Sequence, residues 1–157
     1  MEPQLGIKAE HLDESARILR TFLGDEFVLY GKTRIAHWNV EGPSFHEKHK
    51  FFEEQYKQLD EIMDDVAERI RALGHYTPFT VESCVEHSFL TEQEWKKSDA
   101  SEFVKDLLLD HESIITRLRP YISIFANNLN DLGTGDFVTG LMEAHEKMAW
   151  MLRAQLK

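Results

Sequence analysis

Cysteine is nearly absent from this chain of 157 residues, in which Cys84 stands alone. A single cysteine excludes an internal disulfide and a zinc site built from several thiolates. No apolar run reaches the ~20 residues that a membrane-spanning helix needs. The first residues, MEPQLGIKAEHLDES, lack the basic-then-apolar layout of a secretory signal. We therefore expect a protein of the reducing cytoplasm with no membrane segment.

Positive charge is also scarce, with 18 Lys and Arg against 28 Asp and Glu and a formal net charge of −10. Such a surface repels nucleic-acid phosphates. The stretch MEPQLGIKAEHLDE holds only Lys8 among several acids, and the chain stops at Lys157, so no lysine-rich tail offers a DNA contact. We expect weak or no direct DNA binding at physiological salt. The acidic balance suits a protein that handles cations, although it also serves solubility.

Apolar residues recur at spacings of three and four, which predicts helices, and no sustained alternation indicates strands. Four long helices are expected over residues 8–39, 44–73, 101–127 and 135–155. Thr134 is the expected N-cap of the last helix, and Pro120 should kink the third. The connection over residues 75–99 has room for a short helix near residues 81–87. The chain is thus expected to be one all-α domain, residues 1–157, folded as a four-helix bundle with one long crossover.

The stretch HWNVEGPSFHEKH, residues 37–49, holds three histidines around a Gly42-Pro43 break. In one straight helix His37 and His49 would lie ~18 Å apart. If the chain reverses at the break, two antiparallel helices bring these histidines level, since each lies six residues from it. His46 is expected to stay outside. The break therefore makes a shared metal site feasible.

Carboxylates follow on the next helix, where Glu53, Asp64 and Glu68 fall on the same side as His49. His49 and Asp64 are nevertheless ~22 Å apart along the helix, so one chain cannot bring both to one metal. Two antiparallel copies about a two-fold axis near residues 57–60 would do so and would form two identical sites. Nitrogen and oxygen ligands without thiolate suit Fe(II), Mn(II) or Zn(II). Alternatively, these acids form an ordinary solvated helix face and His49 is a bystander.

The segments HWNVEGPSFHEKHKFFEEQY and DEIMDDVAERIRALG closely resemble the signature of the Dps family, the miniferritins of the ferritin-like superfamily. DHESIITRLR and HEKMAWMLRAQL also resemble family segments, so the likeness extends from about Leu19 to Leu156. By this resemblance, one subunit contributes His37, His49 and Glu53 to a di-iron ferroxidase centre. The two-fold-related subunit contributes the remaining ligands, Asp64 and Glu68. Glu53 departs from the aspartate that is common in the family.

The resemblance further implies a hollow shell of twelve subunits that oxidises Fe(II), usually with hydrogen peroxide, and stores ferric mineral. Trp38 matches a tryptophan beside the centre that donates electrons in the family, although it also fits the role of a core or interface aromatic. The turn NNLNDLGTGDF resembles the region lining acidic pores, so Asp131 and Asp136 are candidates for iron entry. Asp136 fits equally well as a first-turn helix charge.

Two other functions are weighed against this one. A ferritin with its site inside one bundle uses Glu-x-x-His pairs. Arg34, His46, Leu108 and Met142 stand three residues before the histidines at 37, 49, 111 and 145, which argues against such a site. A non-catalytic bundle or metal-binding shell remains an alternative. The other histidines are expected to be surface or structural residues: His11, His46, His75, His87, His111 and His145.

Overall fold

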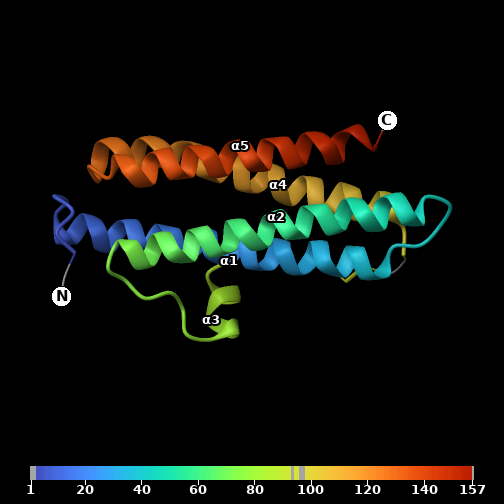
Figure 1. Cartoon of the computed structure of the whole chain (residues 1–157), viewed down its shortest axis with the longest axis horizontal. Coiled ribbons are helices and arrows are strands. Elements are labelled where there is room, and N and C mark those ends of the chain that lie inside the picture. Colours follow the sequence, from blue (N-terminus) through green and yellow to red (C-terminus); the bar gives the residue numbers. More distant parts are fainter. Residues whose placement is uncertain (1–2, 93, 96–97, 157) are drawn as a thin grey trace.

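The computed structural model describes residues 3–92, 94–95 and 98–156. Its four long helices are α1 (Ala9–Asn39), α2 (Phe45–Ala72), α4 (Ala100–Ser123) and α5 (Leu132–Ala154). A short helix α3 (Val81–Glu86) lies in the long connection, and a π-helical turn η1 (Ile124–Asn128) follows α4. Figure 1 shows α1 paired with α2 and α4 paired with α5, all along the long axis. The described residues contain no strand, so the all-α prediction is confirmed.

The α1–α2 hairpin turns where the Gly-Pro break predicts it. Gly42 adopts a φ of +110°, a conformation that is costly for residues with a Cβ. Pro43 follows it and keeps the two helices from joining. The reversal sets the end of α1 beside the start of α2 (Figure 1).

The apolar stripe of α2 packs into the core as its spacing predicts. Five side chains of that stripe are at most 1% exposed: Phe52, Leu59, Val66, Ile70 and Leu73. Each such burial contributes roughly 1.5–3 kcal/mol relative to an exposed side chain. Tyr56 and Met63, which belong to the same stripe, are only partly buried at its edge. The core therefore fixes which face of α2 stays outside.

The long connection is anchored to α1. Gly24 lies so close to it that a Cβ there would be 2.7 Å from the Cys84 carbonyl oxygen. The buried Asp25 carboxylate accepts hydrogen bonds from the Ser88 hydroxyl at 2.9 Å and the Phe89 amide at 2.7 Å, and Arg117 of α4 binds it at 2.5 Å. Burial raises the pKa of Asp25, although these donors oppose the shift. α3 is thereby held against α1, where Figure 1 places it.

The expected start of the last helix is wrong. α5 begins at Leu132 with Asp131 as its N-cap, not at Gly135 with Thr134. The Asp131 carboxylate captures the Thr134 amide at 3.0 Å, and a negative acceptor suits the positive end of a helix. α4 continues through Pro120, and the π-helical turn η1 begins four residues after this proline. No helix in the described residues has the length and apolarity that crossing a membrane requires.

Candidate metal centre

His37 at the end of α1 and His49 near the start of α2 lie face to face. Their ring centroids are 3.7 Å apart with 23° between the planes. His37 is buried and His49 partly buried. The hairpin thus brings together the two histidines that the sequence separates by twelve residues.

The hydrogen bonds of this pair define its tautomers. His37 Nδ1 donates to the His49 backbone oxygen at 2.8 Å, and His49 Nδ1 donates to the His37 oxygen at 2.9 Å. A carbonyl oxygen only accepts, so both Nδ1 atoms carry the proton. In a neutral imidazole this leaves Nε2 unprotonated, which is the form that binds a metal. The His37 oxygen is free to accept because it lies in the last turn of α1.

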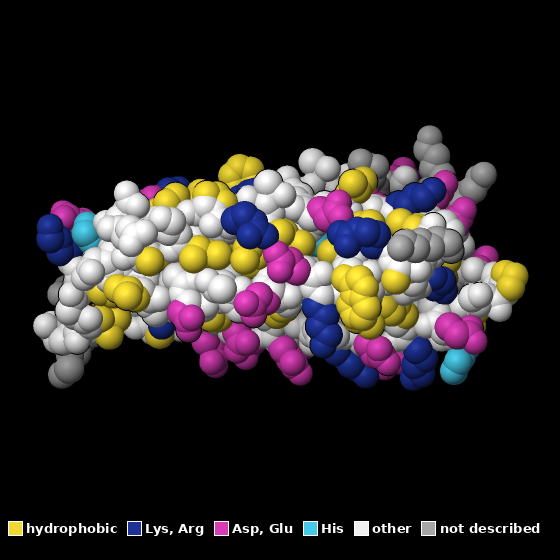
Figure 2. Space-filling view, turned by 90° about the horizontal axis from the view of Figure 1, so that it is seen from above, with side chains coloured by type: hydrophobic (Ala, Val, Ile, Leu, Met, Phe, Trp, Pro, Cys, Tyr) yellow, Lys and Arg dark blue, Asp and Glu magenta, His cyan; other side chains and the backbone are white. Residues whose placement is uncertain are grey.

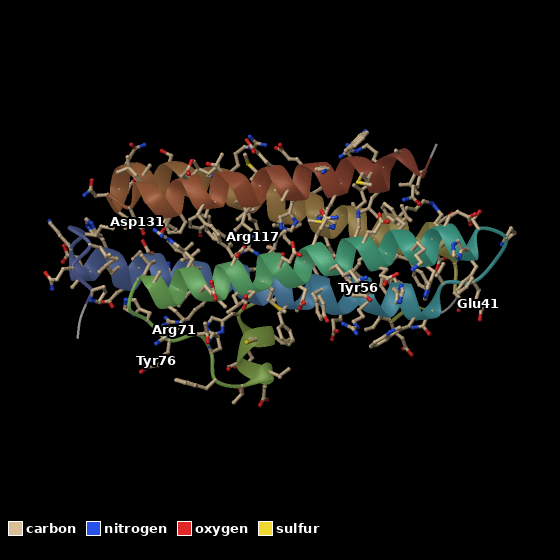
Figure 3. All side chains as sticks on the ribbon, viewed as in Figure 1. Glu41, Tyr56, Arg71, Tyr76, Arg117 and Asp131 are labelled. Atoms are coloured by element: carbon tan, nitrogen blue, oxygen red, sulfur yellow. The ribbon has the colours of Figure 1, made fainter. Side chains whose placement is uncertain are left out.

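Aromatic side chains support the pair. The Tyr56 ring meets the His37 ring edge-on at a centroid distance of 5.2 Å, and Phe45 lies 5.1 Å from His49. Figure 3 shows Tyr56 on α2, toward the end of the bundle where the Glu41 turn lies. Arg34 lies 4.8 Å over the Tyr56 ring and 5.6 Å from the Trp38 ring. Trp38 is 63% exposed, so in this chain it is a surface residue beside the pair.

Glu53 lies one helical turn after His49, but two lysines bind it. Its carboxylate oxygens receive Lys50 Nζ at 2.9 Å and Lys57 Nζ at 2.7 Å. The hydrogen bonds from Lys57 and Lys50 lower the pKa of Glu53 to about 2. Glu53 is therefore an ionised carboxylate at neutral pH.

Asp64 and Glu68 project from α2 further along the helix, and both are exposed. Over residues 3–92, 94–95 and 98–156, neither has a side-chain hydrogen bond or ion pair within the chain. Asp64 lines a shallow surface depression with Asp60 and Met63. The described residues hold no group of three or more ligating side chains close enough for one ion. One chain therefore brings His37 and His49 together, and it leaves Glu53, Asp64 and Glu68 outside that pair.

The candidate pore residues differ from each other. Asp131 is buried, and its oxygens accept from the Thr134 amide and hydroxyl and from Arg69 at 3.2 Å. In Figure 3 it lies at the opposite end of the bundle from the Glu41 turn. Asp136 is exposed on the first turns of α5. Within this chain Asp131 is a helix cap, whereas Asp136 is open to solvent.

A second cluster, formed by His111, His145 and Glu26, lies in the core. The sequence predicts this cluster less clearly than it predicts the His37–His49 pair. His145 Nε2 is 2.8 Å from Glu26 Oε1, and His145 Nδ1 is 2.9 Å from His111 Nδ1. All three side chains are fully buried. Burial, and then the charge of His145, lowers the pKa of His111 well below 6.5. The position of His111 on the apolar stripe of α4 predicts its burial, but nothing in the spacing links it to Glu26 on α1.

Comparison with known proteins places this fold. The family described as the ferritin-like domain matches residues 16–157. Among solved structures, the Dps protein of Vibrio cholerae O1 has a TM-score of 0.92 at 26% identity, covering 99% of this chain and 97% of that one. That protein is described as a member of a broad superfamily of ferritin-like diiron-carboxylate proteins. The helical bundle is thus that of a ferritin-like protein.

Sequence relatives narrow the class. The chain is 34% identical over 139 residues to DNA protection during starvation protein 2 of Bacillus anthracis, covering 88% of this chain and 94% of the relative. It is 38% identical over 150 residues to an uncharacterized low temperature-induced protein of Nostoc sp., covering 96% of this chain and 84% of the relative. The protein belongs to the Dps family of miniferritins.

Proposed function

We propose that this protein is a ferroxidase and iron-storage miniferritin. Two subunits would pack about a two-fold axis so that His37, His49 and Glu53 of one subunit face Asp64 and Glu68 of the other. The observation that carries the proposal is the reciprocal Nδ1 bonding of the histidine pair, which leaves Nε2 of each ring as the nitrogen that can bind a metal. Neutral imidazoles with carboxylates suit Fe(II). The exposed Asp64 and Glu68 are free to complete a site on another copy.

Iron is the substrate of the proposed reaction. Two Fe(II) ions each give one electron to hydrogen peroxide, whose O–O bond breaks as two protons are taken up and two waters form. Because both electrons are delivered together, no hydroxyl radical is released. The preference for peroxide over oxygen rests on the resemblance to the Dps family. The ligand residues of the two chains would hold the two ions and supply negative charge that stabilises Fe(III).

The proposed assembly is a shell of twelve subunits, each the single domain of residues 1–157, which stores ferric mineral in the cytoplasm. Iron would enter where copies of the acidic α5 start converge. Asp136 is the stronger pore candidate because its carboxylate is exposed, whereas Asp131 caps α5. With a formal net charge of −10 per chain, the shell would bind DNA weakly. Figure 2 shows acidic side chains along one margin of a long face, with Lys and Arg side chains among them toward one end.

Iron oxidation by the purified protein tests this function. We expect rapid Fe(II) oxidation with peroxide, and its loss in His37→Ala and in Asp64→Ala, while the solution mass stays that of the wild-type shell. Normal oxidation in both variants would refute the site. A shell that takes up iron without accelerating its oxidation would instead support the alternative, a non-catalytic metal-binding shell.

Mixed assemblies test whether the site is shared. One variant carries His37→Ala and His49→Ala, and the other carries Asp64→Ala and Glu68→Ala. Each alone should be inactive. When the two are disassembled and reassembled in equal amounts, mixed two-fold pairs contain one intact site of two, so about a quarter of wild-type activity should return. An inactive mixture whose subunits have demonstrably co-assembled contradicts a site shared between chains.

A further inference from the structure

Lys50 and Lys57 bind the carboxylate of Glu53, which is one of the proposed metal ligands. They lie three residues before and four residues after Glu53, so both reach the same face of α2. One ammonium group binds each carboxylate oxygen, at 2.9 and 2.7 Å. The other two proposed carboxylate ligands, Asp64 and Glu68, have no such partner among the described residues. Glu53 is therefore held differently from the rest of the ligand set.

Two positive charges beside a ligand oppose the binding of a divalent cation. A metal must displace both ammonium groups before it takes both oxygens of Glu53, and it approaches against their repulsion. In the isolated chain the displacement is feasible, because the side chains of Lys50 and Lys57 are 57% and 62% exposed there. Once released, each lysine regains hydration and rotamer freedom. The contact is thus a competitor for the metal and not a permanent structural pair.

We infer that Glu53 is an exchangeable ligand, held by Lys50 and Lys57 when the site is empty and released to the incoming metal. This inference rests on the proposed function. The lysines weaken the binding of the ion that Glu53 holds, and they recover the carboxylate when that ion leaves. In the proposed two-fold pair, residues near 57–60 surround the axis, so Lys57 would lie between the two sites.

Zinc binding, measured by calorimetry on the metal-free assembled protein, tests the inference without iron oxidation. We expect Lys50→Gln with Lys57→Gln to bind the Glu53-dependent zinc about three- to fivefold more tightly than wild type. Its affinity should also rise less with added salt than that of wild type, because salt screens the repulsion only where the lysines are present. Lys57→Arg, which keeps the charge, should stay near wild type.

Matched controls separate this effect from a general change of charge. Arg17→Gln removes a cation that binds Glu14 three residues away on α1, and it should leave zinc affinity unchanged. In a Glu53→Gln background, removal of the lysines should no longer matter, since their target is gone. The solution mass of every variant is measured. If Lys57→Gln disturbs assembly, Lys50→Gln alone should still tighten binding.

The outcomes distinguish the two proposals. If wild-type protein binds no zinc at the site, the proposed function fails. If wild type binds zinc and the double lysine variant has the same affinity and salt dependence, the exchangeable-ligand inference fails alone. Weaker binding in that variant would also overturn it, because the lysines would then position Glu53 for the metal.

Discussion

The protein contains two histidine pairs whose surroundings are opposite. His37 and His49 stack at the hairpin end of the bundle, and both Nδ1 atoms bind backbone oxygens. His111 and His145 lie in the core, joined to each other through Nδ1 and to Glu26 through His145 Nε2. The first pair uses backbone acceptors for both of its bonds, whereas the second bonds only to side-chain atoms. In the described residues the second pair also leaves His111 Nε2 buried without a hydrogen-bond partner.

The difference shows that bonding and exposure decide what a histidine pair does. A pair anchored through the backbone is rigid and still has free lone pairs, as a ligand requires. A pair closed within the core makes a hydrogen-bonded network that links α1, α4 and α5, at the cost of burying polar groups. We therefore expect changes at the hairpin pair to alter iron chemistry, and changes in the core cluster to alter stability.

The largest effect should follow from Glu26→Ala. It leaves His145 Nε2 without its partner in the core and should lower the free energy of unfolding by about 3–5 kcal/mol. Glu26→Gln keeps an acceptor for His145 and should cost less than half as much. Urea unfolding measures both. Iron oxidation by either folded variant should stay near wild type. A loss of oxidation without a loss of stability would contradict the purely structural role of the core cluster.

The converse change is His49→Gln. It removes one proposed ligand and should slow iron oxidation more than about a hundredfold, since even groups that only orient ligands cost ten- to a hundredfold. His49 is partly exposed, so the unfolding free energy should fall by only about 1 kcal/mol. Stopped-flow oxidation and urea unfolding of the same preparation give the two values. Strong destabilisation with normal iron oxidation would show that His49 is a structural residue and not a ligand.

Stability should depend on pH through the core pair. The folded protein keeps His111 neutral, with its pKa well below 6.5, so the unfolded chain binds more protons in acid. Stability is therefore present above pH 6.5 and falls below it, by up to about 1.4 kcal/mol per pH unit for one group. Unfolding midpoints measured across this range should show the slope. His111→Gln should flatten it, and an unchanged slope in this variant would contradict the assignment.

Two buried carboxylates change the stability in the opposite direction to His111, because they stabilise the folded state as the pH falls. Burial raises the pKa of Asp25 and of Asp110, against their cationic partners Arg117 and Lys32. Their protonation favours the folded state, and the stability this contributes is lost as pH rises through the raised pKa values. The loss below pH 6.5 should consequently level off in stronger acid.

The smallest effect should follow from changes at Tyr56, which touches the hairpin pair through its ring edge. Tyr56→Leu removes an aromatic contact that contributes about 0.5–1.5 kcal/mol, and should slow iron oxidation by about tenfold or less. Tyr56→Phe keeps the ring and should oxidise iron at nearly the wild-type rate. A large loss in Tyr56→Phe would show that the hydroxyl group takes part in the reaction.

Much of the fold was predictable because periodicity and turn chemistry are local. The apolar stripe of α2 and the Gly42-Pro43 turn give the hairpin, and the hairpin makes His37 and His49 neighbours. The N-cap of α5 was mispredicted because Asp131 and Thr134 are both residues that cap helices well. The structure distinguishes them: the Asp131 carboxylate accepts from the Thr134 amide, so Thr134 lies inside the first turn, and Arg69 binds both side chains.

The sequence by itself determined the helices, their acidic surface and the ligand types on α1 and α2. Only the tertiary structure decided which atoms of those residues are available. The tautomers of His37 and His49 depend on carbonyl oxygens across the turn, and the hold on Glu53 depends on the side-chain conformations of Lys50 and Lys57. The Glu26 cluster joins α1 to the α4–α5 pair, which lies far from α1 in the sequence. Spacing sets which face a residue occupies, whereas packing between helices sets what that residue meets.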